Sequence, residues 1–160
     1  MIILGVQFSC TSHKNKSDEI GAEFPEFALK NFEGKTITSS QIFKANKITL
    51  IEFWGTWCNT CVKTMPWLQD LHQRYKGLGL EVVGISVKDV NGKPQAYVKN
   101  KNFTYKFLLN GDSLSKKMKI SEYPMVYLVD NNEKIILFES VRKHTSKDEI
   151  RKKIQEYTNN

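Results

Sequence analysis

Two cysteines three positions apart are the residues of this chain best suited to chemistry. Cys58 and Cys61 form a Trp-Cys-x-x-Cys motif behind an apolar run, Ile48 to Trp54, that is typical of a buried strand. If the pair opens a helix, the two sulfurs lie one turn apart and can form a disulfide. The unpaired N–H groups and the dipole at a helix start stabilise a thiolate. The motif therefore predicts a redox-active dithiol.

The two thiols are expected to have different roles. Cys58 is the expected nucleophile, because Cys-x-x-Cys motifs lower the pKa of the first thiol from about 8.5 to between ~3.5 and ~7.5. Cys61, one turn inside the helix, is the expected resolving thiol, which attacks the mixed disulfide and releases it. The ring of Trp57 is expected to lie beside Cys58, cover its sulfur and limit access to it.

Glu52 is an acid inside the apolar run that precedes the motif. Burial there would raise the pKa of its carboxyl, which could then take the proton from Cys61 as that thiol attacks. The alternative is a structural role, in which Glu52 lies at a sheet edge and pairs with a lysine such as Lys47 or Lys134. Both interpretations are open from the residues alone.

The cysteine pair has two other conceivable uses. A structural zinc site needs four ligands, usually including a second pair with its own short spacing. The remaining cysteine and histidines (Cys10, His13, His72 and His144) form no such pair. A purely structural disulfide would close a very short loop and stabilise little. We therefore expect no metal and no cofactor.

Composition sets the class of the protein. The chain has 160 residues, 40% of them hydrophobic and 26% charged, which suits one globular domain. The formal net charge is +7, but the 24 lysines and arginines are scattered along the chain. That pattern favours a solvated basic surface over a nucleic-acid site. No interface signal stands out, so a monomer is expected.

The amino terminus resembles the end of a lipoprotein signal peptide. An apolar run, Met1 to Ser9, is followed directly by Cys10 and then by a polar segment. The run is too short to span a bilayer, which takes about 20 residues. We expect Cys10 to be lipidated, residues 1–21 to be a signal-like segment and tether, and 22–160 to form the domain. The domain would then lie in the cell envelope, on the periplasmic side. The alternative is an apolar terminus with an incidental cysteine.

Strands and helices alternate along the rest of the chain. Apolar runs and turn residues predict strands at 24–27, 35–38, 48–54, 80–87, 125–129 and 134–138. Helical spacing and capping signals predict helices at 60–76, 93–100 and 113–120, and a last helix opened by a capping box at Ser146. The pattern indicates an α/β fold with a mixed sheet covered on both faces. The last hairpin should lie at one side of that sheet.

Three segments carry a family resemblance: ITLIEFWGTWCNTCVKTMPWLQDLHQRY, LEVVGISVKD and YPMVYLVDNNEKI. They resemble the thioredoxin superfamily and, within it, the TlpA/ResA-like branch of bacterial membrane-anchored thioredoxins. The resemblance implies a thioredoxin-like fold, with a central mixed β-sheet flanked by helices and an N-terminal β-hairpin before the core. It also implies an insertion between central strands, much of it within 89–107.

The same resemblance implies roles for further residues. Pro124 would be a cis proline facing the disulfide, where the backbone pairs with the client next to Cys58, and Tyr123 would line the client groove. Glu52 stands where thioredoxins carry a buried acid behind the second cysteine, which favours the catalytic interpretation.

The chain departs from the branch at three places. Many members have Cys-x-Pro-Cys, whereas this chain has Asn59-Thr60 between the cysteines. Some members place a Glu where this chain has Thr64, and Ser121-Glu122 replaces the usual Gly before the proline. The family's usual reduction potential is therefore not carried over.

Three functions compete. The resemblance favours a thiol–disulfide oxidoreductase that reduces disulfides of exported proteins, such as apocytochromes or misbridged clients, and that is itself reduced by a membrane dithiol protein. A thiol peroxidase is disfavoured because no Pro-x-x-x-Thr-x-x-Cys surrounds either active-site thiol. A binding module without redox turnover is disfavoured because binding does not require two cysteines.

Overall fold

The structure, a computed structural model, describes residues 20–90, 92–141 and 144–159. Cys10 and most of the proposed tether lie outside these residues. The elements follow in the order β1 (Ala28–Asn31), β2 (Thr36–Thr38), α1 (Ser39–Phe43), β3 (Ile48–Trp54), α2 (Asn59–Tyr75), the 3-10 helix η2 (Lys76–Leu78), β4 (Leu80–Ser86), α3 (Lys93–Lys101), β5 (Lys106–Leu109), α4 (Asp112–Lys117), β6 (Met125–Asp130), β7 (Ile135–Ser140) and α5 (His144–Thr158).

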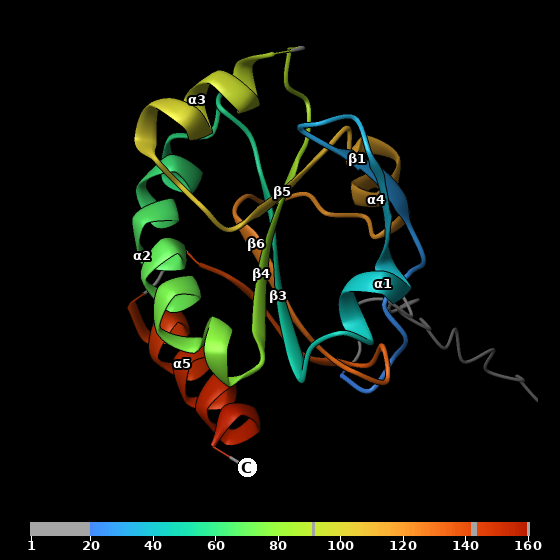
Figure 1. Ribbon diagram of the computed structural model, residues 1–160, viewed down its shortest axis with the longest axis vertical. Coiled ribbons are helices and arrows are strands. Elements are labelled where there is room, and N and C mark those ends of the chain that lie inside the picture. Colours follow the sequence, from blue (N-terminus) through green and yellow to red (C-terminus); the bar gives the residue numbers. More distant parts are fainter. Residues whose placement is uncertain (1–19, 91, 142–143, 160) are drawn as a thin grey trace, which may run out of the picture.

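The strands form one mixed sheet in the order β2-β1-β5-β4-β3-β6-β7. β3 runs parallel to β4 and antiparallel to β6, and the β6–β7 hairpin forms one edge. Helices α2, α3 and α5 cover one face, and α1 and α4 cover the other (Figure 1). The expected thioredoxin-like α/β fold, with its N-terminal hairpin β1–β2, is thus confirmed.

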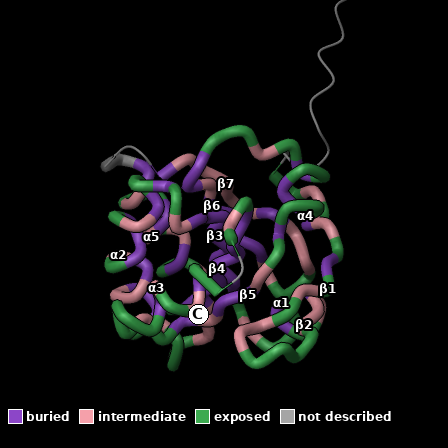
Figure 2. Tube along the Cα trace, turned by 90° about the horizontal axis from the view of Figure 1, so that it is seen from above, coloured by how far each residue is buried: buried purple, intermediate pink, exposed green. Residues whose placement is uncertain are grey.

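The central strand β3 is buried along its whole length, as its continuous apolar run predicts (Figure 2). Successive side chains of a strand point to opposite faces. Phe53 packs edge-on against Tyr127 in an aromatic cluster that reaches Phe43 of α1. Trp54 packs on the opposite face, against Tyr97 of α3. Glu52 shares the face of Trp54 and therefore points toward the layer of α2 and α3.

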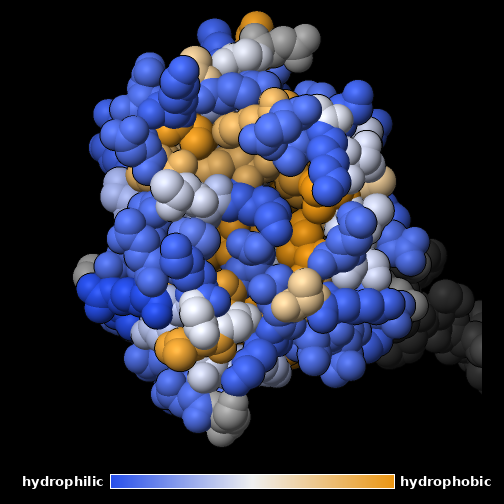
Figure 3. Space-filling model, viewed as in Figure 1, coloured by the Kyte–Doolittle hydropathy of each residue, from blue (hydrophilic) through white to orange (hydrophobic). Residues whose placement is uncertain are grey.

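Most of the molecular face seen in Figure 3 is hydrophilic. Its hydrophobic residues gather in the central and upper part of that face. Exposed residues lie both on the helices and in the loops around the sheet (Figure 2). Within the described part of the chain, no helix combines the length and apolar character needed to cross a bilayer.

Three sequence predictions were wrong in detail. The first strand is Ala28–Asn31 rather than 24–27, because Pro25 lacks the N–H that would continue the ladder begun by the Glu23–Lys134 bridge. Strand β5 was not predicted, since its apolar run is only three residues long. The last helix begins at His144, so Ser146 is not its cap; the Ser146 hydroxyl donates to the Glu139 carboxylate at 3.5 Å instead.

Candidate active site

Three segments meet at one end of the sheet. The parallel strands β3 and β4 both end there, at Trp54 and Ser86. β6 runs the other way, with Met125 opposite Phe53, so Pro124 enters the sheet at the same end. The carboxyl ends of parallel strands are where α/β proteins commonly place their sites.

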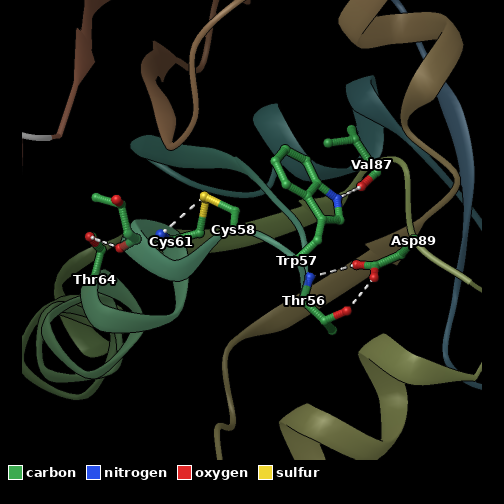
Figure 4. The surroundings of a disulfide bond; sticks show 8 residues. Thr56, Trp57, Cys58, Cys61, Thr64, Val87 and Asp89 are labelled. Atoms are coloured by element: carbon green, nitrogen blue, oxygen red, sulfur yellow. Dashed lines mark hydrogen bonds between the residues drawn. A yellow bond between two sulfur atoms is a disulfide. The ribbon is translucent and has the colours of Figure 1, made fainter.

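Cys58 and Cys61 form a disulfide with a Cα–Cα distance of 5.2 Å, as the sequence predicted (Figure 4). Cys58 is the N-cap of α2, and its sulfur accepts the Cys61 backbone N–H at 3.2 Å. Cys58 retains 7% of its surface and Cys61 none. Cys58 is therefore the more accessible cysteine, at a helix start that favours negative charge.

Hydrogen bonds connect the loop before Cys58 to the loop after β4 (Figure 4). The Thr56 N–H donates to Oδ2 of Asp89 at 2.8 Å, and the Thr56 hydroxyl donates to Oδ1 of the same carboxylate. The Trp57 indole N–H donates to the carbonyl of Val87 at 2.9 Å. A Cβ on Gly55 would lie 2.2 Å from the indole nitrogen, so this close approach requires glycine. Asp89 was not identified as an anchor from the sequence.

Trp57, which precedes Cys58, lies against Tyr123, which precedes Pro124. Their rings pack edge to face at 5.4 Å, and Trp57 is 48% exposed. The Tyr123 hydroxyl shares a hydrogen bond of 2.7 Å with the Ser115 hydroxyl. The Tyr123–Pro124 bond is cis, as the family resemblance implied. Figure 4 shows the Trp57 ring beside the disulfide with its N–H turned toward Val87.

Glu52 is completely buried in the centre of the sheet. Neither carboxylate oxygen has a hydrogen-bond partner among the described residues. Burial raises the pKa of this carboxyl well above its ordinary value. The sheet-edge interpretation is therefore wrong, and Lys134 instead pairs with Glu23 at 3.0 Å.

Tyr105, which sequence reasoning missed, is a second buried polar group on this side of the sheet. Its hydroxyl has no hydrogen-bond partner within the described residues, and burial raises its pKa well above the usual value, with a smaller contribution from the charge of Glu52. Tyr105 stays neutral under ordinary conditions. No cluster of three or more His, Cys, Asp or Glu side chains suited to a metal occurs in the described ranges.

A thioredoxin-like fold with a Cys-x-x-Cys disulfide at a helix start, beside a cis-proline loop, defines a thiol–disulfide oxidoreductase. The chain belongs to the AhpC/TSA family, whose model matches residues 20–138.

Individual proteins agree with this class. The chain is 27% identical over 146 residues to the thiol-disulfide oxidoreductase ResA of Bacillus thuringiensis subsp. konkukian (strain 97-27), covering 91% of this chain and 82% of that protein. It is 26% identical over 117 residues to ResA of Bacillus subtilis (strain 168), covering 72% and 64%.

Solved structures share the fold. A thiol:disulfide interchange protein from Bacteroides sp. superposes with a TM-score of 0.76 at 20% identity, covering 90% of this chain and 93% of that one. The thioredoxin domain of a thiol-disulfide oxidoreductase from Bacteroides vulgatus gives 0.75 at 19% identity, covering 85% and 98%.

Proposed function

We propose that this thiol–disulfide oxidoreductase reduces disulfides of exported proteins, such as apocytochromes or misbridged clients. The observation that carries the proposal is the Cys58–Cys61 disulfide, with the more accessible cysteine as the N-cap of α2. The relatives named ResA support the activity.

The reaction proceeds through a mixed disulfide. The Cys58 thiolate attacks a client disulfide, forms a bond to one client sulfur and expels the other as a thiolate that takes up a proton. The Cys61 thiolate then attacks Cys58, closes the Cys58–Cys61 disulfide and releases the second client sulfur as a thiol after protonation. Two electrons pass from the protein to the client. A dithiol protein, which we place in the membrane, returns them.

Cys58 is activated by its position at the start of α2. Its sulfur accepts the Cys61 N–H and faces the positive end of a 17-residue helix. Both effects favour the thiolate over the thiol.

Glu52 acts as the base for Cys61. Cys61 has no exposed surface, so its proton has no direct route to solvent. Glu52 points toward the layer of α2, and its raised pKa makes its carboxylate a stronger base than an ordinary one. Once protonated, the carboxyl no longer carries a buried charge, which removes the desolvation cost.

The client lies against Trp57, Tyr123 and Pro124. Trp57 adjoins Cys58 and is 48% exposed, and its ring packs against Tyr123, the neighbour of Pro124. Proline contributes no backbone N–H, so the edge beside it remains free to receive client backbone.

Cys10 anchors the domain through a lipid, outside the cytoplasmic membrane. The motif around Cys10 supports this placement. Metabolic labelling with a radioactive fatty acid should mark the wild-type chain and not a Cys10→Ala variant. Equal labelling of both would exclude this anchor.

The activity is tested by trapping. A Cys61→Ser variant should accumulate a mixed disulfide between Cys58 and client, seen by mass spectrometry after non-reducing electrophoresis. A Cys58→Ser variant should trap nothing. Full client binding and biological activity in the Cys58→Ser/Cys61→Ser double variant would favour a binding module. Catalytic peroxide turnover in stopped flow would favour a thiol peroxidase.

A further inference from the structure

The side chain of Lys88 lies over the rings of Trp57, which adjoins Cys58, and Tyr123. Its ammonium nitrogen is 5.3 Å from the centre of the Tyr123 ring and 6.0 Å from that of Trp57. Both distances fall within the range of cation–π attraction. A cation is therefore held at the rim of the proposed client groove.

The backbone holds Lys88 in this place. Its φ is 54°, the left-handed region that residues with a side chain rarely adopt. Its N–H donates to Oδ1 of Asp112 at 2.9 Å. The residues on either side, Val87 and Asp89, bind Trp57 and Thr56 of the active-site loop. The position of Lys88 relative to Trp57 is thus fixed through both neighbours.

The ammonium of Lys88 remains available to an anion. None of the ion pairs among the described residues includes Lys88. The nearest acids along the chain bind other groups. Asp89 accepts the N–H and the hydroxyl hydrogen of Thr56, and Asp112 accepts the backbone N–H of Lys88. The two rings shield one side of the ammonium from water, which strengthens its attraction for a carboxylate.

We propose that Lys88 recognises an acidic side chain of the client, close in sequence to the client cysteine that bonds to Cys58. This inference rests on the proposed function above, since a client in mixed disulfide must place its flanking residues near Trp57 and Tyr123. Clients with Asp or Glu at such a position are preferred over clients with Asn, Gln or Lys. Lys88 binds the client and takes no part in the chemical steps.

Disulfide-closed peptides with one variable residue test the proposal. Asp, Asn or Lys is placed in turn at each of the two positions on either side of the attacked cysteine. At one position or more, the wild-type protein should reduce the Asp peptide with about fivefold higher kcat/KM than the Asn peptide, equal to the ~1 kcal/mol of an exposed charge pair. The difference should lie in KM and should vanish in high salt.

Variants at Lys88 supply the controls. Lys88→Met keeps the aliphatic stem and should lose the preference, Lys88→Arg should keep it, and Lys88→Glu should invert it toward the Lys peptide. Lys119→Met is the matched control, because Lys119 is also exposed with a φ of 52° but lies over no ring of the described residues. It should leave the Asp-to-Asn ratio unchanged.

The outcomes separate this inference from the proposed function. If wild type and Lys88→Met show the same Asp-to-Asn ratio at every position, the inference is overturned and the function stands. If Lys88→Met slows all peptides equally and raises the Cys58 pKa, measured by thiolate absorbance, Lys88 acts on Cys58 and client recognition is overturned. If wild type reduces none of the peptides, the proposed function fails and the inference falls with it.

Discussion

Glu52 lies directly opposite Gly84 in the parallel pairing of β3 with β4. Paired residues project to the same face of a sheet, so on this side the neighbour of the carboxyl has no side chain. The space above Gly84 is filled by aromatic groups: a Cβ there would lie 2.9 Å from the Phe107 ring and 3.0 Å from the Trp54 indole nitrogen. The carboxyl is therefore enclosed by protein, without a hydrogen-bond partner among the described residues.

This enclosure predicts that Glu52 makes stability depend on pH. Because its native pKa is raised above the unfolded value of about 4.3, the unfolded chain ionises first as pH rises, and stability is lost up to the native pKa. At neutral pH, Glu52→Gln should therefore be more stable than wild type. The gain should grow by about 1.4 kcal/mol for each pH unit above the unfolded pKa, until the native pKa is reached.

Urea unfolding of the oxidised protein measures this gain without interference from thiol titration. The stability difference between Glu52→Gln and wild type should shrink as pH falls and disappear near about pH 4. A difference that stays constant from about pH 4 to 8 would show that Glu52 does not titrate with a raised pKa.

A kinetic prediction concerns the resolving step. With Cys58 held in a mixed disulfide with a chromophoric thiol, Glu52→Gln should slow release by Cys61 about 10²-fold at neutral pH, the usual contribution of a general base. The difference in release rate between Glu52→Gln and wild type should become smaller at higher pH, where Cys61 ionises without a base. Stopped-flow absorbance follows the release. Glu122→Gln, which neutralises an exposed acid beside Tyr123, is the control and should release normally. Equal rates in all three proteins would remove Glu52 from the mechanism.

Gly84 should tolerate no side chain. Gly84→Ala forces a methyl group against Phe107 and Trp54, and we expect a loss of about 1–3 kcal/mol in the free energy of unfolding. Gly77→Ala is the matched control, because no atom of the described residues beyond its own neighbours in the chain lies within 4 Å of its would-be Cβ. Urea titration of both variants gives the comparison. Equal stability of the two would mean that the aromatic layer yields to the added methyl.

Asp89 should be required for the active-site loop. Asp89→Ala leaves the N–H and hydroxyl of Thr56 without their acceptor, which should cost about 1.5–3 kcal/mol, toward the lower end because the site is only partly buried. Asp89→Asn keeps one acceptor oxygen and should therefore lose less stability than Asp89→Ala. The free energy of unfolding, measured by urea titration, and kcat/KM for client reduction should fall together. An unchanged kcat/KM in Asp89→Ala would show that the anchor does not position Trp57 and Cys58.

The sequence predicted the parts of this molecule that depend on local pattern. The apolar run at 48–54 predicted the buried strand, and the spacing of Cys58 and Cys61 predicted the disulfide. The family resemblance supplied the cis bond at Pro124. All three follow from residues close together in the chain or from a motif shared with relatives.

The rest depends on contacts between distant segments. Asp89 lies 33 positions from Thr56 and Asp112 lies 24 from Lys88, so no local pattern pairs them. Lys88 looks like any surface lysine until the loops bring it over Trp57 and Tyr123. Tyr105 precedes β5, a strand too short to predict. Its burial on the same side of the sheet as Glu52 was therefore not foreseen.

The equilibrium potential of the Cys58–Cys61 couple tests the central claim most directly. The oxidised and reduced fractions are measured by thiol alkylation and mass spectrometry in glutathione and dithiothreitol buffers. A reductant of exported disulfides should have a potential near or below about −250 mV, in the range of thioredoxin. A potential above about −180 mV would place the protein among isomerases and oxidants and would contradict the proposed direction of electron flow. A pair that never bridges would contradict redox function altogether.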